Sequence, residues 1–150
     1  MIVTEQALIE RYKWILERKR DLNNATFKIA VFYQTAASAL LASEFAVLFS
    51  VNKGELSIDI AYFSTTSIFL LFCAVTGLGL CLIIGGIFSW VSYRNDEIKL
   101  ESVIGIAIAG SPNFSGLLRW YETYIATVML AMFFFGLWGY IEIIEYLKLL

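Results

Sequence analysis

The chain contains no histidine, one proline and two cysteines among its 150 residues. Histidine is the commonest metal ligand and the commonest acid–base group near neutral pH, so its absence argues against zinc or haem sites and against ordinary serine hydrolase chemistry. The two cysteines, Cys73 and Cys81, lie on one expected helix, eight positions apart, where they cannot bridge each other. We therefore predict that the chain is not an enzyme and holds no metal and no cofactor.

Charged residues are also scarce, at 16% of the chain, whereas hydrophobic residues reach 59%. Soluble globular proteins have roughly 25% charged and about 45–50% apolar residues. The net charge of −2 leaves no basic excess that would indicate a nucleic-acid partner. The composition predicts an all-α integral membrane protein, with residues 1–150 forming a single membrane domain in a lipid bilayer.

Three transmembrane helices are expected, over residues 26–51, 62–93 and 121–146. Each contains about 20 or more predominantly apolar residues, which is enough to cross a hydrocarbon core of roughly 30 Å. The second span lies in a stretch without any charge that is longer than the core requires, so it should tilt or project. A short polar loop, residues 52–61, joins the first two spans.

The segments before and between the spans are expected to be helical in part. Residues 1–25 predict an amphipathic helix, which either binds the membrane surface or a partner, or packs on neighbouring helices. We expect this helix to bend or end at Asn23–Asn24, although nothing there forces a break. Residues 94–120 predict a loop with a short interfacial or re-entrant helix at 96–109, started by residues 95–97.

A strong break is expected at residues 110–113, which read Gly-Ser-Pro-Asn. Ser111 as the N-cap and Pro112 at the first helical position would begin the next helix. The amphipathic helix and the 94–120 loop should lie on the same side of the membrane. Together with Lys28 at the start of the first span, they carry nine of the 11 lysine and arginine residues. The positive-inside rule therefore predicts a cytoplasmic N-terminus and an external C-terminus. The expected location is the inner (plasma) membrane.

One face of the second span carries small residues at every fourth position. They are Cys73, Gly77, Cys81, Gly85 and Ser89. Small residues let helix backbones approach closely in lipid, where no hydrophobic drive brings helices together. The face is predicted to be a subunit interface of a homo-oligomer, or alternatively to pack against the first or third helix of the same chain.

A few polar residues fall inside the spans. Glu44 lies about two turns inside the outer end of the first span, where an unpartnered charge costs on the order of 2–3 kcal/mol or more. It is predicted to be a proton site or a cation-path carboxylate, or simply a glutamate near the interface. The hydroxyl groups of residues 64–67 should lie at a similar depth. Glu142 and Glu145 either join Glu44 or end the third span, and Gln34 is expected to form hydrogen bonds across helices.

The layout of residues 5–110 resembles a known family. A charged helix, Arg11-Tyr12-Lys13-Trp14 through Glu17-Arg18-Lys19-Arg20, leads into a closely spaced hairpin of membrane helices and a cytoplasmic helical segment. This layout is similar to that of the small SLATT-type membrane effectors of bacterial phage defence. The resemblance implies a homo-oligomer that permeabilises the inner membrane when a cytoplasmic partner signals. The third span departs from the two-helix pattern.

Three hypotheses for the function follow. The first is a homo-oligomeric effector or channel-like subunit that forms or gates a pathway through the bacterial inner membrane. The second is a non-catalytic membrane anchor for a protein partner, and the third is a small proton- or ion-coupled transporter. In the first two, a cytoplasmic protein partner would bind through residues 1–25 and 94–120.

Overall fold

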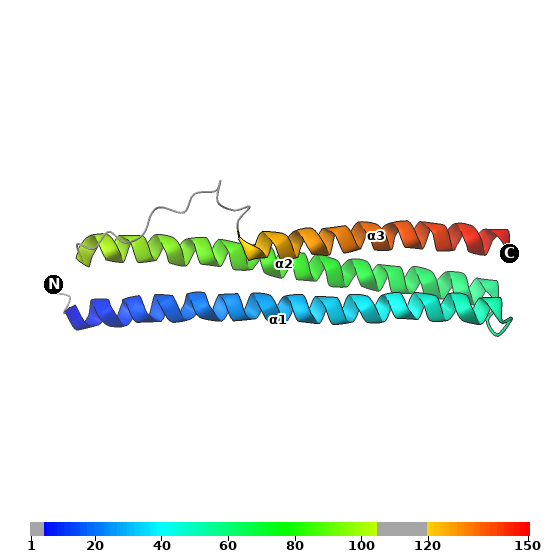
Figure 1. Cartoon of the computed structure of the whole chain (residues 1–150), viewed down its shortest axis with the longest axis horizontal. Helices are drawn as coiled ribbons and strands as arrows, with labels where there is room; N and C mark the ends of the chain where they lie inside the picture. The colour runs from blue at the N-terminus through cyan, green and yellow to red at the C-terminus, as the bar shows by residue number, and fades with distance from the viewer. Residues whose placement is uncertain (1–4, 105–119) are drawn as a thin grey trace. The chain divides into compact units, whose positions relative to one another are not determined.

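The computed structural model describes residues 5–104 and 120–150, which form three helices and no strand (Figure 1). The helices are α1 (Glu5–Asn52), α2 (Ile58–Ile104) and α3 (Tyr121–Leu149). Each is long and apolar enough to cross a membrane. The all-α class and the three long apolar helices are thus as predicted, and they support a membrane protein.

The first helix is longer than its expected parts. α1 has 48 residues and continues through Asn23 and Asn24, so the expected bend or end does not occur. No glycine or proline occurs between Glu5 and Asn52, and two asparagines alone are too weak to stop a helix. The segments predicted to be an amphipathic helix and a first span are therefore parts of one helix, roughly 72 Å long at 1.5 Å per residue.

The second helix also continues beyond its expected end. α2 has 47 residues and ends at Ile104, so residues 95–97 do not start a separate helix. Two ion pairs at helical spacing support the continuous form, Arg94–Glu97 at 2.6 Å and Lys99–Asp96 at 3.7 Å. The remainder of the predicted interfacial helix and the Gly110–Asn113 break, with Ser111 and Pro112, lie outside the described residues.

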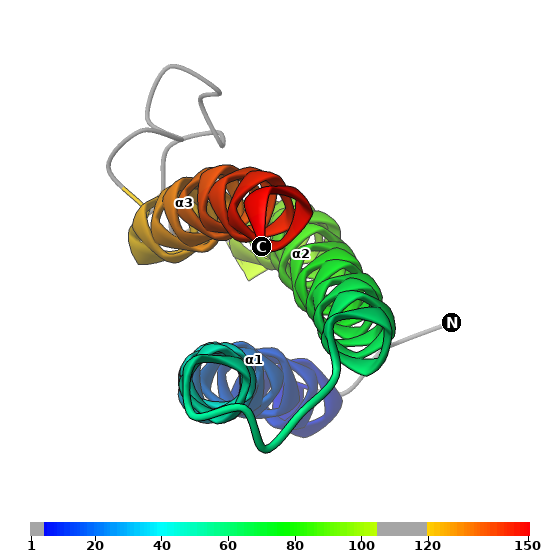
Figure 2. The same ribbon diagram turned by 90° about the vertical axis from the view of Figure 1, so that its right-hand side faces the viewer.

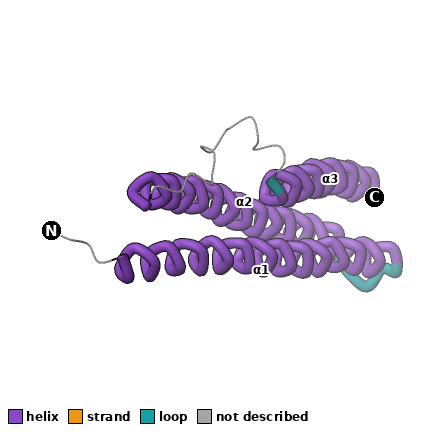
Figure 3. Tube along the Cα trace, turned by 60° about the vertical axis from the view of Figure 1, so that its left-hand side comes forward, coloured by secondary structure: helices purple, strands orange, loops and turns teal. Residues whose placement is uncertain are grey.

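A tight turn joins α1 to α2 (Figure 3). Gly54 has a φ of +73°, a left-handed conformation in which a side chain is strained. Its N–H donates to the Val51 carbonyl at 2.9 Å, and the Glu55 N–H donates to the Ser50 carbonyl at 3.0 Å. These two bonds form a Schellman motif, which satisfies carbonyls at the end of α1 and fixes the position of the turn.

Contacts within the chain divide it into two compact units. Unit 1 comprises Met1–Ile29 and Leu82–Tyr124, and unit 2 comprises Ala30–Cys81 and Ile125–Leu150. All three helices contribute residues to unit 2, whose turn and C-terminus face the viewer in Figure 2. The core of unit 2 includes Tyr33 and Ala37 of α1, Phe72 of α2, and Met129 of α3.

Candidate functional site: a cavity with two carboxylates and an open helix face

The three helices of unit 2 meet around the hydroxyl group of Tyr33. This side chain is 3% exposed, and its hydroxyl oxygen lies 3.3 Å from the Met129 carbonyl and 3.4 Å from the Thr76 Oγ1. Tyr33 donates its proton to the Met129 carbonyl, and Thr76 donates to the Phe72 carbonyl at 2.8 Å. A polar group of α1 thereby connects to α2 and α3 in the core of unit 2.

Glu44 lines a cavity of about 300 Å³ formed by residues of all three helices in unit 2. Its Oε2 atom is buried and has no hydrogen-bond partner in the described part of the chain, and the same holds for Oγ1 of Thr65. The hydroxyl group of Thr65, one of the four hydroxyl residues expected near Glu44, lies beside the Glu44 carboxyl group. The structure therefore brings one of the four hydroxyl groups near the Glu44 carboxyl group, but no hydrogen bond of ordinary geometry within the described chain satisfies either buried oxygen.

Glu142 of α3 lines the same cavity as Glu44. It is itself exposed, and it also lines a second cavity of about 370 Å³ with Asn52 and Tyr146. Asn52 accepts a hydrogen bond of 2.8 Å from the Tyr146 hydroxyl near the ends of α1 and α3. Glu145 is exposed and lines neither cavity. Two of the acidic residues singled out from the sequence are therefore brought together, and the third is not.

Two glycines in unit 2 allow close packing between α2 and α3. A Cβ atom added at Gly79 would meet Met129, and one added at Gly136 would meet the ring of Phe72 closer than 3.0 Å, which real Cβ atoms essentially never show. Phe72 is 4% exposed, and its ring lies 6.2 Å from that of Phe133. Gly79 and Gly136, which the four-residue repeat did not include, are therefore the glycines on which this packing depends.

The small-residue face of α2 lies elsewhere on the helix. A Cβ atom added at Gly77 or Gly85 would meet nothing within 4 Å. Cys81 is exposed, whereas Cys73 and Ser89 are half-buried. The glycines of this face therefore do not pack against the first or third helix among the described residues. Gln34 is also exposed, and no hydrogen bond joins it to another described helix.

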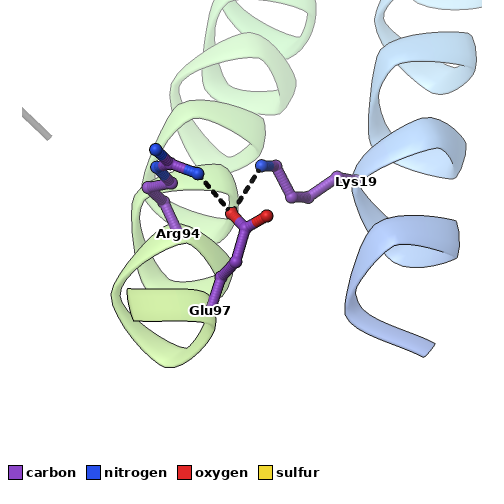
Figure 4. A network of polar contacts seen from close by, with 3 residues as sticks. All are labelled: Lys19, Arg94 and Glu97. Carbon is purple, nitrogen blue, oxygen red and sulfur yellow. Dashed lines mark hydrogen bonds and ion pairs between the residues drawn. The ribbon is translucent and has the colours of Figure 1, made fainter. Parts of the chain in front are cut away.

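Unit 1 contains a polar network that the sequence analysis did not predict (Figure 4). Glu97 is 3% exposed and accepts hydrogen bonds from Lys19 at 2.9 Å and Arg94 at 2.6 Å. Lys19 also lies over the ring of Trp90, 5.0 Å from its centroid. The sequence contains one indication of this network. Lys19 follows Ile15 by one helical turn and so lies on the same face of α1, where Ile15 is fully buried.

The charge of Glu97 is stabilised by its partners. Glu97 lies beyond the charge-free stretch that ends at Tyr93. Burial alone would raise the pKa of its carboxyl group. The hydrogen bonds and positive charges of Lys19 and Arg94 outweigh burial, so the pKa of Glu97 is lower than its ordinary value of 4.5. This network holds α1 to α2 within unit 1.

Comparisons with models of protein families, with curated proteins and with solved structures found no match for this chain. No group of three or more potential metal ligands gathers among the residues that the structure describes.

Proposed function

We propose that this chain is a homo-oligomeric membrane protein that forms or gates a pathway through the bacterial inner membrane. The observation that carries the proposal is the small-residue face of α2, where a Cβ atom at Gly77 or Gly85 would have no neighbour within 4 Å. Small residues at every fourth position favour close helix association in lipid. Since this face is not filled within the described chain, the proposed subunit contact joins the faces of separate copies.

The two carboxyl groups of the cavity would supply the ionisable side chains of the pathway. Glu44 belongs to α1 and Glu142 to α3, whereas the small-residue face belongs to α2. Subunit contact and ion pathway are therefore assigned to different residues, which can be tested separately. The layout shared with SLATT-type effectors supports a role in phage defence, in which a cytoplasmic partner would signal the opening.

The two native cysteines provide a test of the subunit contact. They are the only cysteines of the chain, and Cys81 is exposed on the proposed interface. Mild oxidation of the protein in native membranes should produce a disulfide-linked dimer. Cys81→Ser should abolish the product and Cys73→Ser should reduce it less, because Cys73 is half-buried.

Native mass in lipid nanodiscs complements the cross-linking. The wild-type chain should have the mass of a discrete oligomer, and Gly77→Leu or Gly85→Leu should convert it to smaller species. Ala39→Leu, a matched change at an exposed position of α1, should leave the mass unchanged. A monomer in nanodiscs together with no cross-linked product in membranes would refute the proposal.

A second candidate function, the proton- or ion-coupled transporter, is favoured by the cavity. Glu44 and Glu142 both line it, and the Oε2 atom of Glu44 has no hydrogen-bond partner within residues 5–104 and 120–150. Carboxyl groups inside membrane spans often carry coupled protons or ions. If the chain is a transporter, proteoliposomes should take up an ion or substrate along an imposed gradient, and Glu44→Gln should abolish this uptake. Passive leakage that does not saturate would instead favour the oligomeric pathway.

A further inference from the structure

The cavity of unit 2 combines aromatic walls with two carboxyl groups. Six of its fifteen lining residues are aromatic: Phe45, Phe69, Phe72, Phe135, Trp138 and Tyr140. Among the residues that the structure describes, Glu44 and Glu142 are the only charged ones in the wall, and no described lysine or arginine lines it. Its volume of about 300 Å³ lies at the lower end of the range of sites that hold small organic ligands.

Neither carboxyl group is neutralised by the described part of the chain. No ion pair joins Glu44 or Glu142 to a described residue. The Oε2 atom of Glu44 is buried without accepting a hydrogen bond. A carboxylate among apolar side chains is costly unless a donor or a positive charge compensates it. The buried Glu44 oxygen is therefore available to accept a hydrogen bond or to pair with a positive charge.

The chemistry of the wall narrows the choice of occupant. Calcium and magnesium take about six or more oxygen ligands, many more than two carboxyl groups in an apolar wall supply. A lipid acyl chain would fit the apolar surface but would leave the Glu44 oxygen without a partner. A cation on an apolar body suits both parts, because aromatic faces attract cations by about 0.5–2 kcal/mol each and the carboxylate neutralises the charge.

We propose that this cavity binds a lipophilic organic cation, an ammonium group carried on an apolar body, with Glu44 as its buried counter-ion and Glu142 at the entrance. The roles differ because the Glu44 oxygen is buried whereas Glu142 is exposed and also lines the second cavity. The site is formed within unit 2 of one protomer. The inference names a ligand for the second candidate function and does not rest on the oligomer.

Benzyltrimethylammonium is a suitable probe, and neopentylbenzene is its uncharged isostere. Binding to the full chain in nanodiscs can be followed by the tryptophan emission of a Trp14→Phe, Trp90→Phe, Trp120→Phe variant, which retains Trp138 in the cavity wall. The cation should bind saturably, and Glu44→Gln should weaken its binding by about tenfold or more. Glu142→Gln should weaken it by a few fold and chiefly at low salt, since an exposed charge is screened. The isostere should not distinguish these variants.

Glu145→Gln is the matched control, because Glu145 is exposed one helical turn from Glu142 and does not line the cavity. The proposal fails if the cation does not bind, if the isostere binds as tightly as the cation, or if Glu145→Gln weakens binding as much as Glu44→Gln. Thermal unfolding of each variant shows that it is folded. Saturable binding of the cation without its gradient-driven uptake would refute the transporter function but not the binding site. The transporter and the binding site are therefore tested separately.

Discussion

Gly136 of α3 lies directly against the ring of Phe72 of α2. A Cβ atom added at position 136 would be closer than 3.0 Å to the Cε1 atom of the ring and within 3.4 Å of Cζ and Cδ1. Phe72 is buried, and its ring also stacks with that of Phe133 at a centroid distance of 6.2 Å. Even one methyl group at position 136 therefore requires either the ring or the helix to move.

Gly136→Ala is therefore predicted to destabilise unit 2. Overpacking of this kind costs about 1–3 kcal/mol, which exceeds the gain in helix propensity of about 1 kcal/mol at most. Gly139→Ala is the matched control, because a Cβ atom at position 139 would meet nothing within 4 Å. Thermal midpoints in detergent micelles should be lower for Gly136→Ala than for Gly139→Ala. Equal midpoints would contradict the close contact with Phe72.

The hydroxyl group of Tyr33 is predicted to contribute to stability through two partners. Tyr33→Phe removes the donor to the Met129 carbonyl and the hydroxyl group that contacts Thr76 while it keeps the ring, so it should cost about 0.5–1.5 kcal/mol. Thr35→Val is a suitable comparison, because its exposed hydroxyl group bonds only to the Val31 carbonyl of its own helix. A double-mutant cycle of Tyr33→Phe with Thr76→Val should give a coupling energy above zero. Strict additivity would show that the 3.4 Å contact contributes nothing.

The sequence predicted the three long helices because their apolar runs are nearly free of charge and longer than soluble proteins need. It did not predict that α1 and α2 continue beyond the apolar runs. The polar signals at Asn23–Asn24 and Asn95–Glu97 are local preferences, and ion pairs such as Arg94–Glu97 outweigh them. Helix ends depend on such small energy differences, whereas the existence of a long apolar helix does not.

The candidate site was predictable in part. Glu44 is the only charged residue between Lys28 and Lys53, and the structure brings it to the same cavity as Glu142. Their shared cavity depends on the register between α1 and α3, which a single sequence does not contain. The same limit applies to the glycines, because the sequence presents Gly77 and Gly79 alike. Only the packing shows that Gly79 faces Met129 and that Gly77 faces open space.

The turn between α1 and α2 is predicted to require Gly54. At a φ of +73°, Gly54→Ala places a Cβ atom in the left-handed region, which costs roughly 1–2 kcal/mol. Gly54→Asn should cost less, because asparagine tolerates this conformation better than alanine. Space is not the cause, since a Cβ atom there would meet nothing within 4 Å. Thermal midpoints should therefore rank wild type above Gly54→Asn and Gly54→Asn above Gly54→Ala, and equal midpoints for the two variants would show that backbone strain is not decisive.

The ion pair between Lys19 and Glu97 is predicted to stabilise unit 1. Lys19→Gln removes one of two charged donors to a buried carboxylate and should cost about 1–3 kcal/mol. Lys13→Gln changes an exposed lysine on the same helix and should have an effect within about 0.5 kcal/mol. A Trp138→Phe background keeps Trp14, Trp90 and Trp120 as reporters, all of which belong to unit 1. Equal thermal midpoints for the two lysine variants would contradict this role.

Acidification should weaken the contact between Lys19 and Glu97, because the pKa of Glu97 is lowered in the folded state. A carboxyl group whose pKa is lower in the folded state stabilises that state fully above its ordinary pKa of 4.5 and loses this contribution as the pH falls through the lowered value. The wild type should therefore lose thermal stability below about pH 4.5. Glu97→Gln should lose less over the same range, because its amide does not titrate. If both proteins lost the same amount of stability in acid, another group would be responsible, and the ionised form of Glu97 would not be what holds α1 to α2 in unit 1.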